Sequence, residues 1–337
     1  MAMTSPLDAD DPSWPEIRQG VRDLCARFPG SYWRAKDRDR SYPSEFVGAL
    51  TDAGYLACLI PEAYGGSGLP LSAAAAILEE IHKSGGNGAA CHAQMYTMGT
   101  LLRHGSEAQR QAYLPGIARG ELRLQAFGVT EPDAGSNTLS IATTAVRDGD
   151  DYVINGKKIW TSRAEHSDLM LLLARTTPRE QVEKRSRGLS VFLIDLRRHL
   201  GHGVEIQPIR TMINHATTQV FFDDLRVPAS ALVGEQDRGF GYILDGMNAE
   251  RVLIAAECVG DGRWFVDQAR RYASDRSVFG APIGAKQGVQ FPIARAYAAV
   301  EAADLMVQQA AEQFDTGKAC GETANMAKLL ASEAAWQ

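Results

Sequence analysis

The sequence predicts an α+β protein of several domains, in which a β-rich middle part separates two helical bundles. Three observations support this fold class. The chain has 337 residues, which is more than a single hydrophobic core usually supports. Residues 1–122 and 236–337 show the apolar spacing and capping residues of helices. Residues 123–235 instead hold short β-branched runs separated by glycine-containing turns, a pattern typical of a β-barrel or sandwich.

The N-terminal part is expected to form a helical bundle. Residues 13–16 and 106–109 both have the Ser-x-x-Glu/Gln pattern of a capping box, which marks a helix start. Pro43 and Ser44 open another helix, which Gly54 can close. Further helices are expected over residues 71–84 and 88–103.

The middle part is expected to consist of short strands. One stretch, residues 151–162, predicts a hairpin, because apolar alternation runs into Asn155-Gly156 and a second strand follows. The charged run over residues 177–187 predicts an exposed loop. The other strands are expected over residues 124–129, 141–146, 169–174, 189–194, 204–209 and 219–222.

The C-terminal part is again predicted to be helical. Helices are expected over residues 240–259, 263–274, 287–314 and 322–337. The last of these reaches Gln337 without a glycine or a basic cap, so we expect the native sequence to continue beyond this point.

Composition excludes several classes of function. The net charge of −6 argues against nucleic acid or an anionic membrane as a partner. The five cysteines are scattered and never spaced Cys-x-x-Cys, which indicates reduced thiols in a cytoplasmic protein without a structural zinc site. The seven histidines show no metal-ligand spacing, so we expect no metal centre. No apolar run has the length of a membrane span, and the N-terminus does not have the pattern of a signal peptide.

Residues 127–137 carry the most informative loop. The strand that precedes this loop cannot continue through Pro132, which lacks an N–H, and turn-forming residues follow. The loop therefore offers hydroxyls and free backbone N–H groups, which can bind the polar edge of a ring. Taken alone, the loop is more simply read as a chain reversal.

Two motifs together change this interpretation. Residues 130–136 read Thr-Glu-Pro-Asp-Ala-Gly-Ser, and residues 155–162 read Asn-Gly-Lys-Lys-Ile-Trp-Thr-Ser. Their order and spacing resemble the acyl-CoA dehydrogenase family of flavoproteins, in which the two motifs flank the isoalloxazine ring of FAD. The resemblance extends over the whole chain and implies an N-terminal bundle, a central barrel and a C-terminal bundle. It also implies FAD as cofactor, an acyl-CoA as substrate and an electron-transferring flavoprotein as electron acceptor. The implied assembly is a homo-oligomer, a dimer of dimers.

The resemblance also implies the site residues. Those that match the family's substrate contacts are Asn248 and Arg251 for the CoA portion and Ser136 for the pantetheine. Arg276 matches the arginine suited to the FAD pyrophosphate of a neighbouring subunit, because its planar fork binds two phosphate oxygens. Phe279 and Gln287 match contacts to the adenine half of the same cofactor. The flavin contacts implied at the ring are Phe127, Val129, Thr130, Gly135, Ser136, Trp160, Thr161 and Ser162.

Glu250 is the candidate catalytic base. It shares an apolar helical stripe with Ile243, Met247 and Ile254, and partial burial there would raise the pKa of a carboxyl group toward neutrality. By itself, such a glutamate is more simply read as an ion pair with Arg251 or across a subunit interface. Its place before an arginine is similar to that of the base in the isovaleryl and long-chain branches of the family. In other branches the base lies further along, beyond the present sequence.

The expected reaction is the α,β-dehydrogenation of an acyl-CoA to a trans-2-enoyl-CoA. The glutamate would take the α-proton, and the β-hydride would pass to flavin N5. Two alternatives stay open: an acyl-CoA oxidase on the same scaffold, and a flavin-binding family member without turnover. The acyl group is also left open, because it depends on a pocket expected to be lined partly by residues 90–100 and 244–250.

Overall fold

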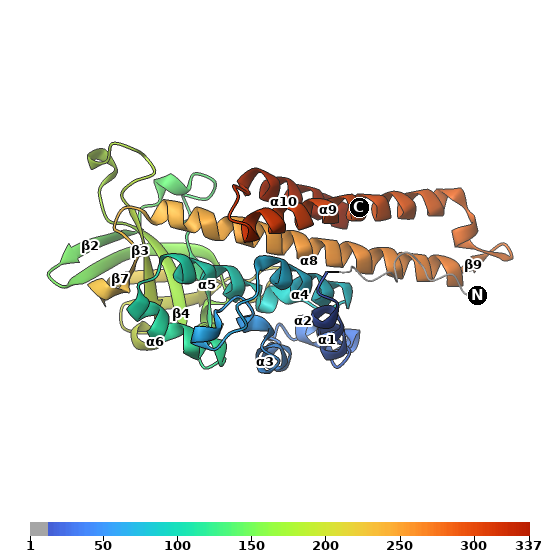
Figure 1. Cartoon of the computed structure of the whole chain (residues 1–337), viewed down its shortest axis with the longest axis horizontal. Coiled ribbons are helices and arrows are strands. Elements are labelled where there is room, and N and C mark those ends of the chain that lie inside the picture. Colours follow the sequence, from blue (N-terminus) through green and yellow to red (C-terminus); the bar gives the residue numbers. More distant parts are fainter. Residues whose placement is uncertain (1–12) are drawn as a thin grey trace. The chain divides into compact units, whose positions relative to one another are not determined.

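The computed structural model describes residues 13–337, which form two compact units built from separated stretches of the chain (Figure 1). The helical unit consists of the described residues as far as Ala35, of Leu69–Gly88 and of Asn248–Gln337. The sheet unit consists of Lys36–Gly68 and Ala89–Met247. Along the sequence, helices are followed by strands and then by helices, which confirms the predicted fold class.

One eight-stranded sheet organises the sheet unit. The hydrogen-bonded order is β6-β7-β3-β2-β4-β5-β8, and β1 pairs with β4 in parallel. Among the described residues no pairing joins β6 to β8, so the sheet is open and does not close into a barrel. The strands are β1 (Leu124–Gly128), β2 (Thr144–Asp148), β3 (Asp151–Ser162), β4 (Leu169–Arg175), β5 (Leu189–Asp195), β6 (Val204–Pro208), β7 (Thr217–Pro228) and β8 (Leu232–Val233).

The sheet separates two apolar cores. Side chains alternate along a strand, so Leu169 and Leu171 of β4 enter one core while Met170 and Leu172 enter the other. The first core also contains apolar side chains from α5 (His92–His104) and α6 (Glu107–Ala118). Because β4 is covered on both faces, its sequence is an unbroken apolar run with no polar alternation.

The other helices of the sheet unit confirm several predicted starts and ends. Helix α3 (Ser44–Asp52) begins at the predicted serine, and Gly54 follows it with a φ of 79°. At the start of α6 the predicted capping box is formed: Ser106 Oγ accepts from Gln109 N at 3.1 Å, and Gln109 Oε1 accepts from Ser106 N at 3.0 Å. Helix α7 (Leu196–His199) follows β5.

The predicted hairpin at Asn155-Gly156 is wrong. Strand β3 runs without interruption from Asp151 to Ser162, and the chain reverses before it, between β2 and β3. Asn155 bonds across to β7, where its Oδ1 accepts from Asp224 N at 2.8 Å, and the pairing shifts register beside Gly156. The Asn-Gly pair therefore makes a bulge in a strand that β7 pairs along nearly its whole length.

The helical unit contains most of the long helices. Its elements are α1 (Pro15–Cys25), the first part of α2 (Gly30–Arg38), α4 (Leu71–Lys83), the greater part of α8 (Gly239–Asp275), β9 (Ser277–Val278), β10 (Ala281–Pro282), α9 (Gln287–Asp315) and α10 (Gly321–Trp336). The predicted break near residue 260 is wrong, because α8 is one unbroken helix (Figure 1). Its glycines serve packing instead. A Cβ on Gly260 would lie 2.3 Å from the carbonyl oxygen of Glu79, and one on Gly262 would lie 2.5 Å from Val300 Cγ2.

The prediction that Ser13 caps the first helix is wrong, because Trp14 holds the N-cap position. Helix α1 begins at Pro15, and Trp14 precedes it with a left-handed φ of 55° and no side-chain cap. Arg18 Nε donates to the carbonyl oxygen of Ser13 at 3.0 Å. The backbone of Ser13 is thus bonded to a side chain of the first turns of α1.

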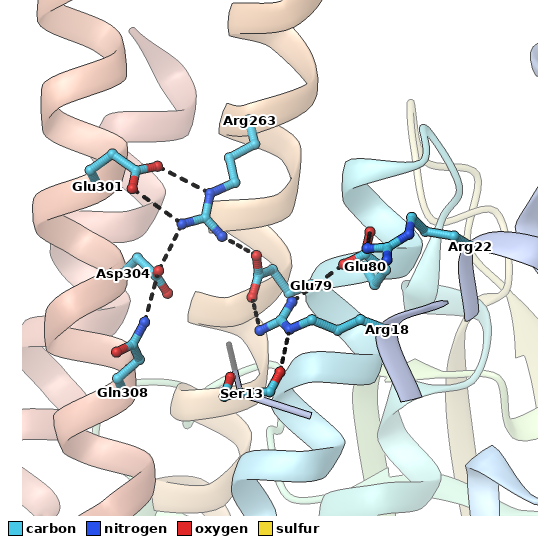
Figure 2. Close-up of polar contacts among 9 residues, drawn as sticks. All are labelled: Ser13, Arg18, Arg22, Glu79, Glu80, Arg263, Glu301, Asp304 and Gln308. Atoms are coloured by element: carbon cyan, nitrogen blue, oxygen red, sulfur yellow. Dashed lines mark hydrogen bonds and ion pairs between the residues drawn. The ribbon is translucent and has the colours of Figure 1, made fainter. Parts of the chain in front are cut away.

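Charged side chains link four helices of the helical unit (Figure 2). Glu79 of α4 pairs with Arg263 of α8 and with Arg18 of α1, the latter at 2.9 Å. Arg263 also pairs with Asp304 of α9 at 2.7 Å and with Glu301 at 3.1 Å. Burial alone would lower the pKa of the Arg263 guanidinium, but the surrounding carboxylates, Glu79 foremost, raise it above its ordinary value. This largely buried cation therefore stays charged and joins α4, α8 and α9.

The five cysteines, all within the described residues, form no disulfide, and four of them are buried. Burial raises the pKa of Cys25 and Cys58 to about 12, so their thiols are poor nucleophiles at neutral pH. Within residues 13–337, no helix combines the length and apolar character needed to cross a bilayer.

Candidate functional site

The two sequence motifs lie side by side in the sheet unit. The backbone N–H of Ile159 in β3 donates to the carbonyl oxygen of Thr130 at 2.9 Å, just beyond the end of β1. A tight turn follows, in which Glu131 and Ala134 exchange two backbone hydrogen bonds of 3.1 Å. The structure therefore brings together the loop at residues 130–136 and the end of β3, as the motif interpretation requires.

A buried ion pair fixes the loop to the strand. Lys158 Nζ of β3 lies 2.8 Å from Glu131 Oε1 and donates to the carbonyl oxygen of Val129 at 3.0 Å. The same carboxylate accepts backbone N–H bonds from Ala142 at 2.6 Å and Thr143 at 3.0 Å. The carboxylate of Glu131 is thus bonded to Lys158 of β3 and to the adjacent backbone groups of Ala142 and Thr143.

Burial affects the pKa of each partner differently. Burial lowers the pKa of Lys158 to about 8, against the opposing effect of Glu131, so the ammonium is still mostly charged at pH 7. Burial would raise the pKa of Glu131, but the charge of Lys158 and the backbone N–H groups outweigh it and lower that pKa. Both groups are therefore ionised near neutral pH, and the pair holds the loop electrostatically.

Trp160 and Thr161 have the features of a binding surface. Trp160 has a φ of 61°, which is unfavourable for an L-residue, and the pairing of β3 with β7 shifts register around it. Its side chain is 58% exposed, whereas Thr161 is buried. The Thr161 hydroxyl has no hydrogen-bond partner in the structure. A strained backbone thus exposes a flat indole, and the next residue has an unsatisfied buried hydroxyl.

The remaining residues of this group differ in exposure. Ser162 Oγ accepts from Asn214 Nδ2 at 2.9 Å, so a loop between β6 and β7 supports the end of β3. Thr130 is half-buried, while Gly135 and Ser136 are exposed. Phe127 is half-buried and Val129 is buried.

This donor set fits a flavin. An isoalloxazine ring needs a flat apolar contact on one side, and its pyrimidine edge and N5 need hydrogen-bonding groups. Trp160 supplies the flat contact, and Thr161 supplies an unsatisfied buried hydroxyl, the kind of group that a native structure normally pairs. Thr130 and Ser162 add further hydroxyls within the same two motifs.

The candidate base and two of the substrate candidates lie in the helical unit, on α8. Glu250, Asn248 and Arg251 are all half-buried. Arg251 Nη1 donates to Asn248 Oδ1 at 3.0 Å, which holds the guanidinium along the helix toward the preceding turn. The two predicted CoA contacts are therefore brought together.

The cofactor candidates of the helical unit surround a small hairpin. Strands β9 and β10 pair across Phe279 and Gly280, whose φ values of 53° and 76° suit a tight two-residue turn. Phe279 is 97% exposed at the tip of this hairpin. Arg276 and Gln287, just before β9 and at the start of α9, are also exposed. This group has the surface character expected of residues that contact another molecule.

The sequence interpretation missed three supporting residues: Glu131, Lys158 and Asn214. The first two were visible as charges inside stretches otherwise expected to be strand or turn, and a buried charge needs a partner. Asn214 gave no signal, because its role depends on how the β6–β7 loop meets β3. Within the described residues, no group of three or more acidic, histidine or cysteine side chains could hold a metal ion.

Comparison with protein families assigns almost the whole described chain. The model of the acyl-CoA dehydrogenase N-terminal domain matches residues 14–121. The middle-domain model matches residues 126–225, and the C-terminal-domain model matches residues 237–337.

Individual proteins agree with this result. The chain is 35% identical over 323 residues to acyl-CoA dehydrogenase FadE12 of Mycobacterium tuberculosis, covering 94% of this chain and 81% of the relative. Among solved structures it is similar to a glutaryl-coenzyme A dehydrogenase in complex with glutaryl-CoA, with 31% identity, a TM-score of 0.87 and coverage of 97% and 83%. It is also similar to PigA with FAD and proline, with 25% identity, a TM-score of 0.88 and coverage of 97% and 85%.

Proposed function

Since the chain belongs to the acyl-CoA dehydrogenase family, we propose that it catalyses the FAD-dependent α,β-dehydrogenation of an acyl-CoA to a trans-2-enoyl-CoA. The observation that carries the proposal is the pair of motifs that Glu131 and Lys158 hold together in the sheet unit. Their exposed indole and unpaired hydroxyl match what a flavin ring requires.

The sheet unit would hold the cofactor. Trp160 would pack against the flavin ring, and the hydroxyls of Thr130, Thr161 and Ser162 would bond its polar edge. FAD, when bound, supplies the acceptor for the β-hydride. The positive φ of Trp160 supports this role, because backbone strain of this kind is concentrated at ligand sites.

Glu250 would remove the α-proton of the substrate. Its side chain is half-buried on α8, and a carboxylate is a group that can act as a general base toward the carbon beside a thioester. Asn248 and Arg251, on the same helix, would contact the CoA portion, and Ser136 the pantetheine.

The proposal includes partners. The exposed hairpin residue Phe279, with Arg276 and Gln287, would reach the adenine half of FAD in a second copy of the chain, which requires a homo-oligomer. A dimer of dimers is the arrangement we expect from the family resemblance. An electron-transferring flavoprotein would accept the electrons. A cytoplasmic location stays a prediction from the cysteine pattern.

The experiment is an anaerobic absorbance titration of the FAD-loaded protein with a panel of acyl-CoAs. Wild type, Glu250→Gln and Asp267→Asn would be compared, the last as a matched control on α8. We expect one class of acyl-CoA to bleach the flavin band in the wild type and the control, and the bleaching to be lost in Glu250→Gln.

Three other outcomes would change the assignment. Bleaching that persists in Glu250→Gln would keep the dehydrogenation and reject this base. Rapid reoxidation by dioxygen after bleaching would indicate an oxidase instead of a dehydrogenase. If no thioester bleaches firmly bound FAD, the enzymatic proposal is refuted.

A further inference from the structure

Arg163, the residue directly after the second motif, has a buried cation without a carboxylate partner. The residue is 3% exposed, and its Nη2 lies 3.3 Å from His92 Nε2. Among residues 13–337, no carboxylate forms an ion pair with its guanidinium. Lys158 of the same motif, by contrast, lies 2.8 Å from Glu131. Leaving a buried charge without an opposite one is costly, so the cation of Arg163 requires an explanation.

The contact with His92 does not remove this charge. All polar hydrogens of a guanidinium are donors, so the contact requires His92 Nε2 to accept, with the imidazole neutral and its proton on Nδ1. A protonated His92 would instead place a second positive charge 3.3 Å away. In both protonation states of His92, the guanidinium of Arg163 keeps its full positive charge.

The charge of Arg163 acts on its surroundings. Burial raises the pKa of Tyr42, and the positive charges of Arg123 and Arg163 oppose that rise. Burial also lowers the pKa of His166, and Glu165 opposes this change while Arg163 adds to it. Tyr42 and His166 stack with their ring centroids 4.1 Å apart, so both effects concern one place in the sheet unit. The field of this guanidinium therefore extends beyond its direct contact, as expected in an interior of low permittivity.

The backbone holds Arg163 beside the proposed flavin site. Its φ of 59° is the second left-handed value in a short stretch, after the 61° of Trp160, and such strain is concentrated at functional sites. The backbone N–H of Arg163 donates to the carbonyl oxygen of Ala216 at 2.6 Å. Ser162, one residue earlier, supplies a hydroxyl proposed for the polar edge of the ring. Because consecutive Cα atoms are about 3.8 Å apart, the guanidinium lies on the order of 10 Å from a ring held there.

Reduction of a flavin changes its charge. Hydride transfer from the β carbon brings two electrons and one proton to N5, so the reduced ring carries one more negative charge than the oxidised ring. In the proposed reaction the α-proton goes to Glu250. The two electrons later leave to the electron-transferring flavoprotein, and the N5 proton is released to water. A cation close to the ring stabilises the more negative, reduced form and so raises the reduction potential.

We propose that Arg163 tunes the bound flavin: its cation stabilises the reduced, anionic ring and raises the reduction potential of FAD. The inference rests on the flavin site of the proposed function, and not on the acyl-CoA substrate or on Glu250. At an effective permittivity of about 20, a unit charge roughly 10 Å away changes the equilibrium constant for reduction about tenfold. For a two-electron couple, this corresponds to about 30 mV.

The test is a redox titration of the FAD-loaded protein, reduced anaerobically by dithionite beside a dye of known potential, with no acyl-CoA present. The neutral variants are Arg163→Gln and Arg163→Met, and Arg163→Lys keeps the charge. Arg226→Gln is a matched control, because Arg226 is an exposed arginine of β7 in the same sheet. Far-UV circular dichroism and the Kd of FAD are measured for every variant, so that a loss of folding is seen directly.

We expect the neutral variants to lower the equilibrium constant for reduction about tenfold, or by about 30 mV, while Arg163→Lys and the control stay close to the wild type. An unchanged potential in a neutral variant that binds FAD would overturn the inference. An equal decrease in Arg163→Lys would also overturn it, because the effect would then come from shape instead of charge. Weaker FAD binding at an unchanged potential would do the same, because the guanidinium would then pair with the phosphates of the cofactor.

This test is independent of the proposed reaction, because no acyl-CoA is used. The expected shift in potential, found for a flavin that no thioester bleaches, would refute the proposed reaction and leave this inference standing.

Discussion

Replacing Lys158 by methionine removes the cation of the buried pair that holds the loop at residues 130–136. The side chain of Lys158 is fully buried and lies 2.8 Å from Glu131. Deletion of one partner of such a pair costs about 3–5 kcal/mol, because the other charge is left buried. Glu131 would retain backbone N–H bonds from Ala142 and Thr143, so we expect the lower end, about 3 kcal/mol.

The assay is thermal unfolding followed by circular dichroism and by release of FAD fluorescence. For a unit of this size, 1 kcal/mol shifts Tm by about 2–4 °C, so the variant should melt roughly 6–12 °C lower. The double variant Lys158→Met with Glu131→Gln removes both charges and should recover part of the loss. The single variant Lys158→Met should also retain less FAD than the wild type after purification, because the loop at residues 130–136 is no longer fixed to β3.

Two results would refute this reasoning. A loss below about 1 kcal/mol in Lys158→Met would mean that the backbone N–H bonds alone hold the carboxylate. Additive effects in the double variant would mean that Glu131 and Lys158 contribute independently, despite their 2.8 Å separation.

The remaining predictions concern strain, packing, charge and pH. Trp160→Gly should relieve the left-handed backbone and stabilise the apoprotein by up to about 1 kcal/mol while weakening FAD retention, measured by ultrafiltration; unchanged FAD retention would contradict the site. Gly262→Ala should cost about 1–3 kcal/mol in urea unfolding, and Val300→Ala in the same chain should restore part of it, because the added Cβ meets that side chain. Arg263→Met should cost about 3–5 kcal/mol, since it leaves buried carboxylates without their shared cation, and a matched Arg270→Met at an exposed position of α8 should cost little. The lowered pKa of Glu131 lies below its unfolded value of about 4.3, so its contribution is full above that pH and is lost as the pH falls through the folded value. The urea midpoints of wild type and Glu131→Gln should therefore converge in acid, and a constant difference down to pH 2 would contradict this assignment.

The sequence predicted the fold best where local pattern and burial agree. The apolar runs of β4 and β5 and the capping box at Ser106 are local signals that the structure retains. Prediction failed where a distant segment overrides the local signal. Asn155-Gly156 is a strong turn signal, but β7 pairs along β3 and turns it into a bulge. The break expected near Gly262 is absent because that glycine lets α8 approach Val300 of α9.

For the candidate site, too, the sequence predicted local features and missed contacts between distant segments. Residue types and spacing identified the two motifs, but not the ion pair between them, because Glu131 and Lys158 are far apart in sequence and meet only in the fold. The left-handed backbone at Trp160 was equally invisible, since nothing in an indole side chain signals a positive φ. The roles assigned to Glu250, Asn248 and Arg251 stay predictions until the titrations are done.

The chain enters the helical unit three times, and this has a consequence for how the protein is made. Glu79 is synthesised long before Arg263 and Asp304, which complete its charge network in Figure 2. While the intervening sheet unit is emerging from the ribosome, α1 and α4 have apolar and charged surfaces without their final partners. Such a delay lengthens the exposure of a nascent chain to aggregation, and contacts so distant in sequence are slow to form. Production of this protein should therefore depend on the rate of translation and on the supply of chaperones more than its stability, once folded, would suggest.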